Sequence, residues 1–173
     1  MIVAEQKPIK DILAMLDTYN RVLIAGCRAC VAVCSSGGAK EVAMLSSALR
    51  LARKKQDKPV TLDEITIERQ CEPEMVDQAA ENVKDCDAVL SLACGAGVQL
   101  MGERFPKMVV LPGCNTTFLG VAEELGVWSE RCAGCGNCVL DKTGGLCPIA
   151  RCSKQILNGP CGGSEEGKCE VSK

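Results

Sequence analysis

The segment from residue 130 to residue 170, ERCAGCGNCVLDKTGGLCPIARCSKQILNGPCGGSEEGKCE, limits most strongly what this chain can fold into. It is rich in cysteine and glycine and has almost no apolar periodicity. Such a segment cannot bury enough apolar surface to offset the conformational entropy that it loses on folding. We therefore expect something other than a hydrophobic core to stabilise it. Its cysteines are Cys132, Cys135, Cys138, Cys147, Cys152, Cys161 and Cys169.

The first three of these cysteines have the spacing C-x2-C-x2-C, and a Cys-Pro pair follows at Cys147. This pattern resembles the bacterial iron–sulfur run C-x2-C-x2-C-x3-C-P, with a longer gap before the fourth cysteine. The spacing predicts an iron–sulfur cluster on Cys132, Cys135 and Cys138. A zinc ribbon with four cysteine ligands is the rival interpretation, although ribbons usually contain two C-x2-C pairs.

The spacing does not fix the fourth ligand of this cluster. Cys147, Cys152 and Cys161 are all candidates. Together with Cys169 they exceed what one cluster needs, so the remaining cysteines could form a second site, either another cluster or a zinc ion.

The composition excludes several classes of function. The chain has 173 residues, of which fourteen are cysteine and none is histidine, so zinc sites with histidine ligands and Ser–His or Cys–His catalysis are excluded. A net charge of −2 and 2% aromatic residues do not indicate nucleic-acid binding. The N-terminus does not resemble a signal peptide, and no apolar run is long enough for a membrane span. We expect a cytoplasmic protein, where cysteine at this density favours metal binding over disulfides.

The first two thirds of the chain predict a different kind of structure. Short apolar runs alternate with amphipathic helical patterns, which is typical of right-handed βαβ units and a parallel sheet. The predicted fold is therefore a small α/β domain followed by a cysteine-rich, metal-stabilised segment. The predicted helices cover about residues 7–19, 39–55 and 72–83 and a short helix from residue 95, and the predicted strands cover residues 21–26, 65–70, 87–93 and 107–113.

Cysteines follow all four predicted strands. Because the carboxyl ends of parallel strands meet at one edge of a sheet, where ligands bind in such folds, these cysteines should converge there. The cysteines that we expect at this edge, called the rim below, are Cys27, Cys30, Cys34, Cys71, Cys94 and Cys114.

Three cysteines on one loop and Cys94 on a neighbouring one would form a cage of four thiolates at the rim. Cys71 could replace one of these four or bind beside them, and we assign no role to Cys114. In contrast, Cys86 precedes its strand, so it should lie at the opposite edge as a small buried side chain. Aliphatic periodicity ends near Trp128, and the predicted domains are residues 1–122 and 123–173.

Several motifs resemble those of a known family. These are GCRACVAVC, the VQ after ACGAG, NTTFLG and especially GGLCPIARCSKQILNGPCGG…GKCEV. They are similar to the small cysteine-rich subunit, of the MetV type, of bacterial methylenetetrahydrofolate reductase, also called the reductase C-terminal domain family. The similarity covers nearly the whole chain.

This resemblance implies an iron–sulfur electron-transfer subunit that itself has no catalytic site. It implies [4Fe-4S] clusters, two in number, with zinc as a further candidate metal. Cys27, Cys30, Cys34 and Cys94 would serve the first site, and Cys132, Cys135 and Cys138 with downstream cysteines the second. The implied partner is a TIM-barrel subunit that carries FMN and makes 5-methyltetrahydrofolate, so this chain should bind neither flavin nor folate alone. The alternative function is a zinc-stabilised structural subunit of the same reductase.

Overall fold

The computed structural model describes residues 1–154 and 161–169. The chain divides into two compact units, which are considered separately below. The α/β unit comprises Ile2–Thr117, and the C-terminal unit comprises Phe118–Lys173 together with Met1. Strand β6 (Cys114–Glu124) begins in the first unit and ends in the second.

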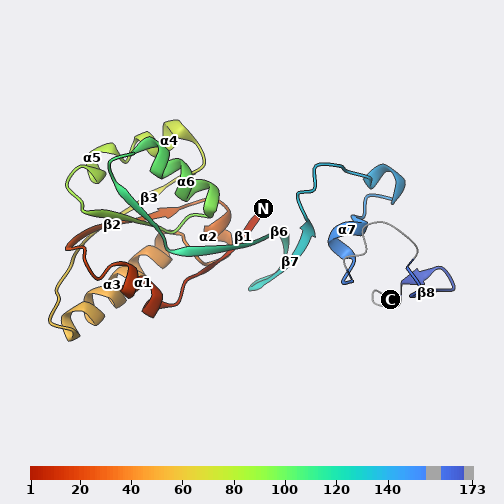
Figure 1. Cartoon of the computed structure of the whole chain (residues 1–173), viewed down its shortest axis with the longest axis horizontal. Helices are drawn as coiled ribbons and strands as arrows, with labels where there is room; N and C mark the ends of the chain where they lie inside the picture. The colour runs from red at the N-terminus through yellow and green to blue at the C-terminus, as the bar shows by residue number, and fades with distance from the viewer. Residues whose placement is uncertain (155–160, 170–173) are drawn as a thin grey trace. The chain divides into compact units, whose positions relative to one another are not determined.

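A parallel four-stranded sheet forms the centre of the α/β unit (Figure 1). Its strand order is β3-β2-β4-β5, and the three neighbouring pairs are all parallel. This confirms the predicted α/β fold. The strands are β2 (Arg21–Cys27), β3 (Thr61–Ile67), β4 (Ala88–Ser91) and β5 (Val109–Pro112).

Helices cover both faces of this sheet, because alternate residues of a strand point to opposite sides. Val22 and Ile24 of β2 pack in one apolar cluster with α1 and α3, whereas Leu23 and Ala25 pack in another with α4, α5 and α6 (Figure 1). The helices are α1 (Ile9–Met15), α2 (Cys30–Val33), α3 (Ala39–Lys55), α4 (Pro73–Asp77), α5 (Ala80–Val83) and α6 (Gly95–Arg104).

Several predicted elements differ from the structure. Helix α1 and strands β4 and β5 are shorter than predicted. The helix predicted over residues 72–83 is divided into α4 and α5. The strand predicted at residues 65–70 both begins and ends earlier, at Thr61–Ile67, and Gln70 lies beyond it with a buried side chain. The sequence also gave no indication of β1 (Ile2–Gln6). This strand is held by distant partners, such as the Thr117 hydroxyl that donates to the Val3 carbonyl over 2.9 Å.

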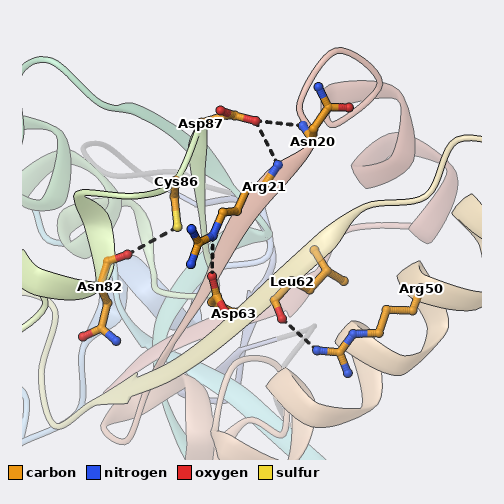
Figure 2. Close-up of polar contacts among 8 residues, drawn as sticks. All are labelled: Asn20, Arg21, Arg50, Leu62, Asp63, Asn82, Cys86 and Asp87. Carbon is orange, nitrogen blue, oxygen red and sulfur yellow. Dashed lines mark hydrogen bonds and ion pairs between the residues drawn. The ribbon is translucent and has the colours of Figure 1, made fainter.

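The edge of the sheet where β2 and β4 begin is held by polar contacts (Figure 2). The Asp87 carboxylate accepts hydrogen bonds from the backbone N–H groups of Asn20 and Arg21 at 2.9 and 2.8 Å. The Arg21 side chain in turn binds Asp63 at 3.0 Å. Cys86 lies at this edge, buried and with its thiol 3.3 Å from the Asn82 carbonyl. The predicted position of Cys86, opposite the rim, is therefore confirmed.

The C-terminal unit has no hydrophobic core of its own among the residues that the structure describes. Every buried hydrophobic side chain belongs to Cys114 or to a residue before it. As the sequence predicts, this unit does not owe its structure to a buried apolar interior. Its elements are the antiparallel pair formed by the end of β6 and β7 (Val127–Cys132), the 3-10 helix η1 (Leu140–Lys142), α7 (Pro148–Arg151), β8 (Ser164–Glu165) and β9 (Lys168–Cys169).

A search of the described residues for membrane-spanning helices finds none with the necessary length and apolar character.

Candidate metal centres

A pocket of about 380 Å³ in the C-terminal unit brings four cysteines together. Its wall runs from the end of β7 through the glycine-rich loop and η1 to α7. The C-x2-C-x2-C triplet and the Cys-Pro cysteine therefore line the same cavity, although the sequence separates them by nine positions. The four cysteines are Cys132, Cys135, Cys138 and Cys147.

Two glycines allow the loop that carries Cys132, Cys135 and Cys138 to turn around this pocket. Gly134 and Gly136 have φ angles of +65° and +76°, in the left-handed region that other residues seldom adopt. The resulting turn directs the Gly134 N–H toward the Cys132 sulfur, at 3.4 Å. Hydrogen bonds of this kind stabilise the negative charge of a thiolate and tune the metal group that it binds.

The Cys-Pro pair places the fourth sulfur in a similar way. Cys147 is the N-cap of α7, and its sulfur accepts a hydrogen bond from the Ala150 N–H at 3.5 Å. Pro148 occupies the first turn of this helix, where its missing N–H costs nothing. Cys147 therefore lines the pocket from the N-cap position of a short helix.

Among the residues that the structure describes, the pocket lining also includes two arginines and no acidic residue. Arg131 forms an ion pair with Glu123. Arg151, at the end of α7, has no ion-pair partner among the residues that the structure describes. Apart from the sulfurs, the charge of the lining is therefore positive, which suits an anionic occupant.

The other three cysteines of this unit do not line the pocket. Cys152 is the C-cap of α7 and is partly exposed. Cys161 and Cys169 are exposed, and Cys169 ends β9. Residues 155–160 of the family-like motif lie outside the described residues. The sequence left Cys147, Cys152 and Cys161 open as fourth ligand, and the pocket distinguishes Cys147 from the other two.

The rim cysteines lie where the sequence predicts, at or just beyond the carboxyl ends of the parallel strands. Cys27 ends β2 and is buried, and Cys94 is the N-cap of α6 after β4. Partial burial raises the pKa of the Cys71 thiol, and the nearby sulfurs of Cys27 and Cys94 raise it further, although the residue as a whole is exposed. Three positions that are distant in sequence therefore lie close to one another.

The loop after β2 contributes two further cysteines. Cys30 begins α2 and Cys34 is its C-cap, so the two cysteines lie one helical turn apart. Burial raises the pKa of the Cys34 thiol, with a smaller contribution from Cys30. The Cys34 thiol lies 3.6 Å from the Ile2 carbonyl. Cys30 is the more accessible of the pair, because Cys34 is buried.

Cys114 is buried at the rim, as are Cys27 and Cys34. Its sulfur lies 3.4 Å from the Ser36 carbonyl and 3.6 Å from the Leu92 carbonyl, so the thiol hydrogen can bond to the backbone. Burial raises the pKa of Cys114 to about 12. A thiol that stays protonated is a poor metal ligand, and this contact pattern fits a structural side chain.

A buried polar network beneath the rim was missed by the sequence analysis. The Gln70 amide donates to the carbonyls of Ala25 and Gly26 at 2.8 and 2.9 Å and accepts from the Ser91 hydroxyl at 2.7 Å. Gln70 and Ser91 are both fully buried. The network joins the ends of β2 and β4 to the turn that carries Cys71. A lone glutamine in a polar stretch gives no sequence pattern by which such a role could be recognised.

Among the described residues, no three cysteine, aspartate or glutamate side chains converge closely enough to hold a metal ion. A single zinc ion needs four sulfurs at about 2.3 Å from one point. The ligands of a four-iron cluster bind separate irons and so surround a larger volume. The four cysteines around the pocket supply the thiol donors that a cluster needs, and two of their sulfurs accept backbone N–H groups. At the rim, the only observation that favours a metal group is the presence of several cysteine thiols.

Residues 111–173 match the family model described as "Methylene-tetrahydrofolate reductase C terminal". The match includes the four pocket cysteines, and of the rim cysteines it includes Cys114. No curated protein and no solved structure matches the chain. The resemblance expected from the sequence motifs is thus supported by an independent comparison. Over residues 111–173 the chain is therefore similar to the methylene-tetrahydrofolate reductase C-terminal family.

Proposed function

We propose that this chain is the iron–sulfur electron-transfer subunit of a methylenetetrahydrofolate reductase complex. In this proposal it passes electrons toward the FMN of a TIM-barrel partner that makes 5-methyltetrahydrofolate, and it carries no catalytic residue itself. The family match of residues 111–173 supports the link to the reductase. The electron-transfer role rests on the cysteine sites.

The pocket in the C-terminal unit is the observation that carries this proposal. Four cysteines line it, two of their sulfurs accept backbone N–H groups, and no acidic side chain competes for a metal. A [4Fe-4S] cluster bound by Cys132, Cys135, Cys138 and Cys147 would supply one-electron transfer there. The protein would bind the cluster through these thiolates.

The rim is the second proposed metal centre. Cys27, Cys30, Cys34 and Cys94 are its proposed ligands, with Cys71 as a substitute or neighbour. Their loops are joined through Gln70 and Ser91, so the backbone around the rim is already ordered in this structure. Either a second [4Fe-4S] cluster or a zinc ion would suit such thiolates. Thiolate centres of this kind require a reducing compartment, and we propose the cytoplasm.

A set of serine variants tests the assignment of the C-terminal cluster. Cys147→Ser should lose one cluster, about four iron and four sulfide per chain, because it removes one of the four thiolates around the pocket. Cys161→Ser should retain that iron, since Cys161 does not line the pocket. Iron and sulfide are measured after anaerobic purification of the full chain.

Cys86→Ala is the matched control, because this cysteine lies at the opposite edge of the sheet from the rim. Its iron content should equal that of the parent protein. Iron loss from Cys161→Ser but not from Cys147→Ser would refute the assignment of Cys147 as fourth ligand.

A further inference from the structure

The two arginines at the cysteine pocket differ in their counter-ions. Arg131 is paired with Glu123, so this pair contributes little net charge to the pocket. Arg151 lines the same pocket and has no ion-pair partner among the described residues. Because no acidic residue lines the pocket among the residues that the structure describes, none of them compensates the positive charge of Arg151 there.

An uncompensated cation has a defined effect on a one-electron centre. Reduction adds one electron and therefore one unit of negative charge, and no bond forms or breaks. A nearby positive charge stabilises the reduced state more than the oxidised state and raises the reduction potential. Net charge and hydrogen bonding near the sulfurs are known determinants of cluster potentials.

We propose that Arg151 is a positioning residue that sets the reduction potential of the C-terminal centre. This inference rests on the proposed cluster at the pocket. Arg151 is close in the chain to a proposed cluster ligand, because it ends the helix whose N-cap is Cys147. The electron itself comes from a low-potential one-electron donor, which in the test below is dithionite with redox mediators.

The test is a redox titration of the full chain, followed by EPR, for Arg151→Gln and Arg151→Lys. Arg151→Gln should lower the equilibrium constant for reduction by about three- to tenfold, which is about 28 to 59 mV for one electron. Arg151→Lys keeps the positive charge and should stay close to the parent value.

Two control variants remove charged side chains other than Arg151. Lys142→Gln removes the same amount of charge in the same unit at a residue that does not line the pocket. The double variant Arg131→Gln/Glu123→Gln removes the neutral ion pair. Both should shift the equilibrium constant less than Arg151→Gln does.

Three results would overturn the inference. The first is a shift in Arg151→Gln no larger than in Lys142→Gln, and the second is a shift in Arg151→Lys as large as in Arg151→Gln. Loss of the cluster from both Arg151→Gln and Arg151→Ala would be the third, because the arginine would then be needed to hold the cluster. Failure of the proposed function is distinguishable, since the parent protein would then contain no iron at all.

Discussion

At the scale of single residues, one glycine determines how closely the rim loops can pack. A Cβ atom added to Gly37 would lie 1.8 Å from the Leu92 carbonyl oxygen, which is backbone and cannot rotate away. The Gly37 carbonyl also accepts the Cys27 N–H at 2.9 Å. The loop that carries Cys27, Cys30 and Cys34 is therefore pressed directly against the end of β4, and only glycine fits there.

Gly37→Ala should destabilise the α/β unit by about 1–3 kcal/mol or more, as overpacking of a tight site does. Urea denaturation followed by circular dichroism measures this. Gly102→Ala in α6 is the control, because nothing lies within 4 Å of its added Cβ. Alanine should stabilise that helix by about 0.5–1 kcal/mol. Equal stability of the Gly37→Ala variant and the parent would contradict the packing described here.

At the scale of elements, polar contacts fasten both ends of β2 and β4. At the rim end, Gln70 and Ser91 bridge the strands inside the core. At the other end, Asp87 accepts two backbone N–H groups from the start of β2 (Figure 2). The N–H donors of Arg21 and Asn20 lower the pKa of the Asp87 carboxyl.

This lowered pKa gives the Asp87 contact a predictable pH dependence. Its stabilisation is fully present above the unfolded-state pKa of about 3.9 and is lost as the pH falls through the lower folded-state pKa. Asp87→Asn should therefore unfold at lower urea concentration than the parent at pH 7. At a pH below both pKa values, the two proteins should have the same midpoint. A difference that is independent of pH would show that the charge of Asp87 is not what stabilises this edge.

Some helices and strands could be predicted from sequence patterns and others could not. Helix α3 has the bounds that its apolar stripe predicts, because Val42, Leu45 and Leu49 pack on the sheet as the periodicity requires. Strand β1 was not predicted, because it is held by partners more than 100 positions away in the chain, such as Thr117. Local periodicity carries no information about such pairing.

At the scale of the whole molecule, the positions of the cysteines were more predictable than their grouping. The parallel topology alone placed Cys27, Cys94 and Cys114 at one edge of the sheet and Cys86 at the other. That Cys147 lines the pocket whereas Cys152 and Cys161 do not was not predictable, because it depends on the position of the N-cap of α7. A spacing motif identifies the donors, and only the fold shows which of them share a cavity.

The two units differ in how much apolar surface they bury. The α/β unit buries two apolar clusters on opposite faces of its sheet. Among its described residues, the C-terminal unit buries no hydrophobic side chain after Cys114, so a metal group there would also stabilise the fold. The lack of a buried apolar interior in these residues is what we expect of a segment that is stabilised by a metal group bound to cysteines.

Anaerobic analysis of iron, sulfide and zinc in the purified full chain, with EPR of the reduced protein, tests the central claim most directly. We expect about four iron and four sulfide for the C-terminal centre, and about eight of each if the rim also holds a cluster. Reduced protein should give a cluster EPR signal. Zinc without iron would contradict the electron-transfer role and favour a structural subunit of the reductase.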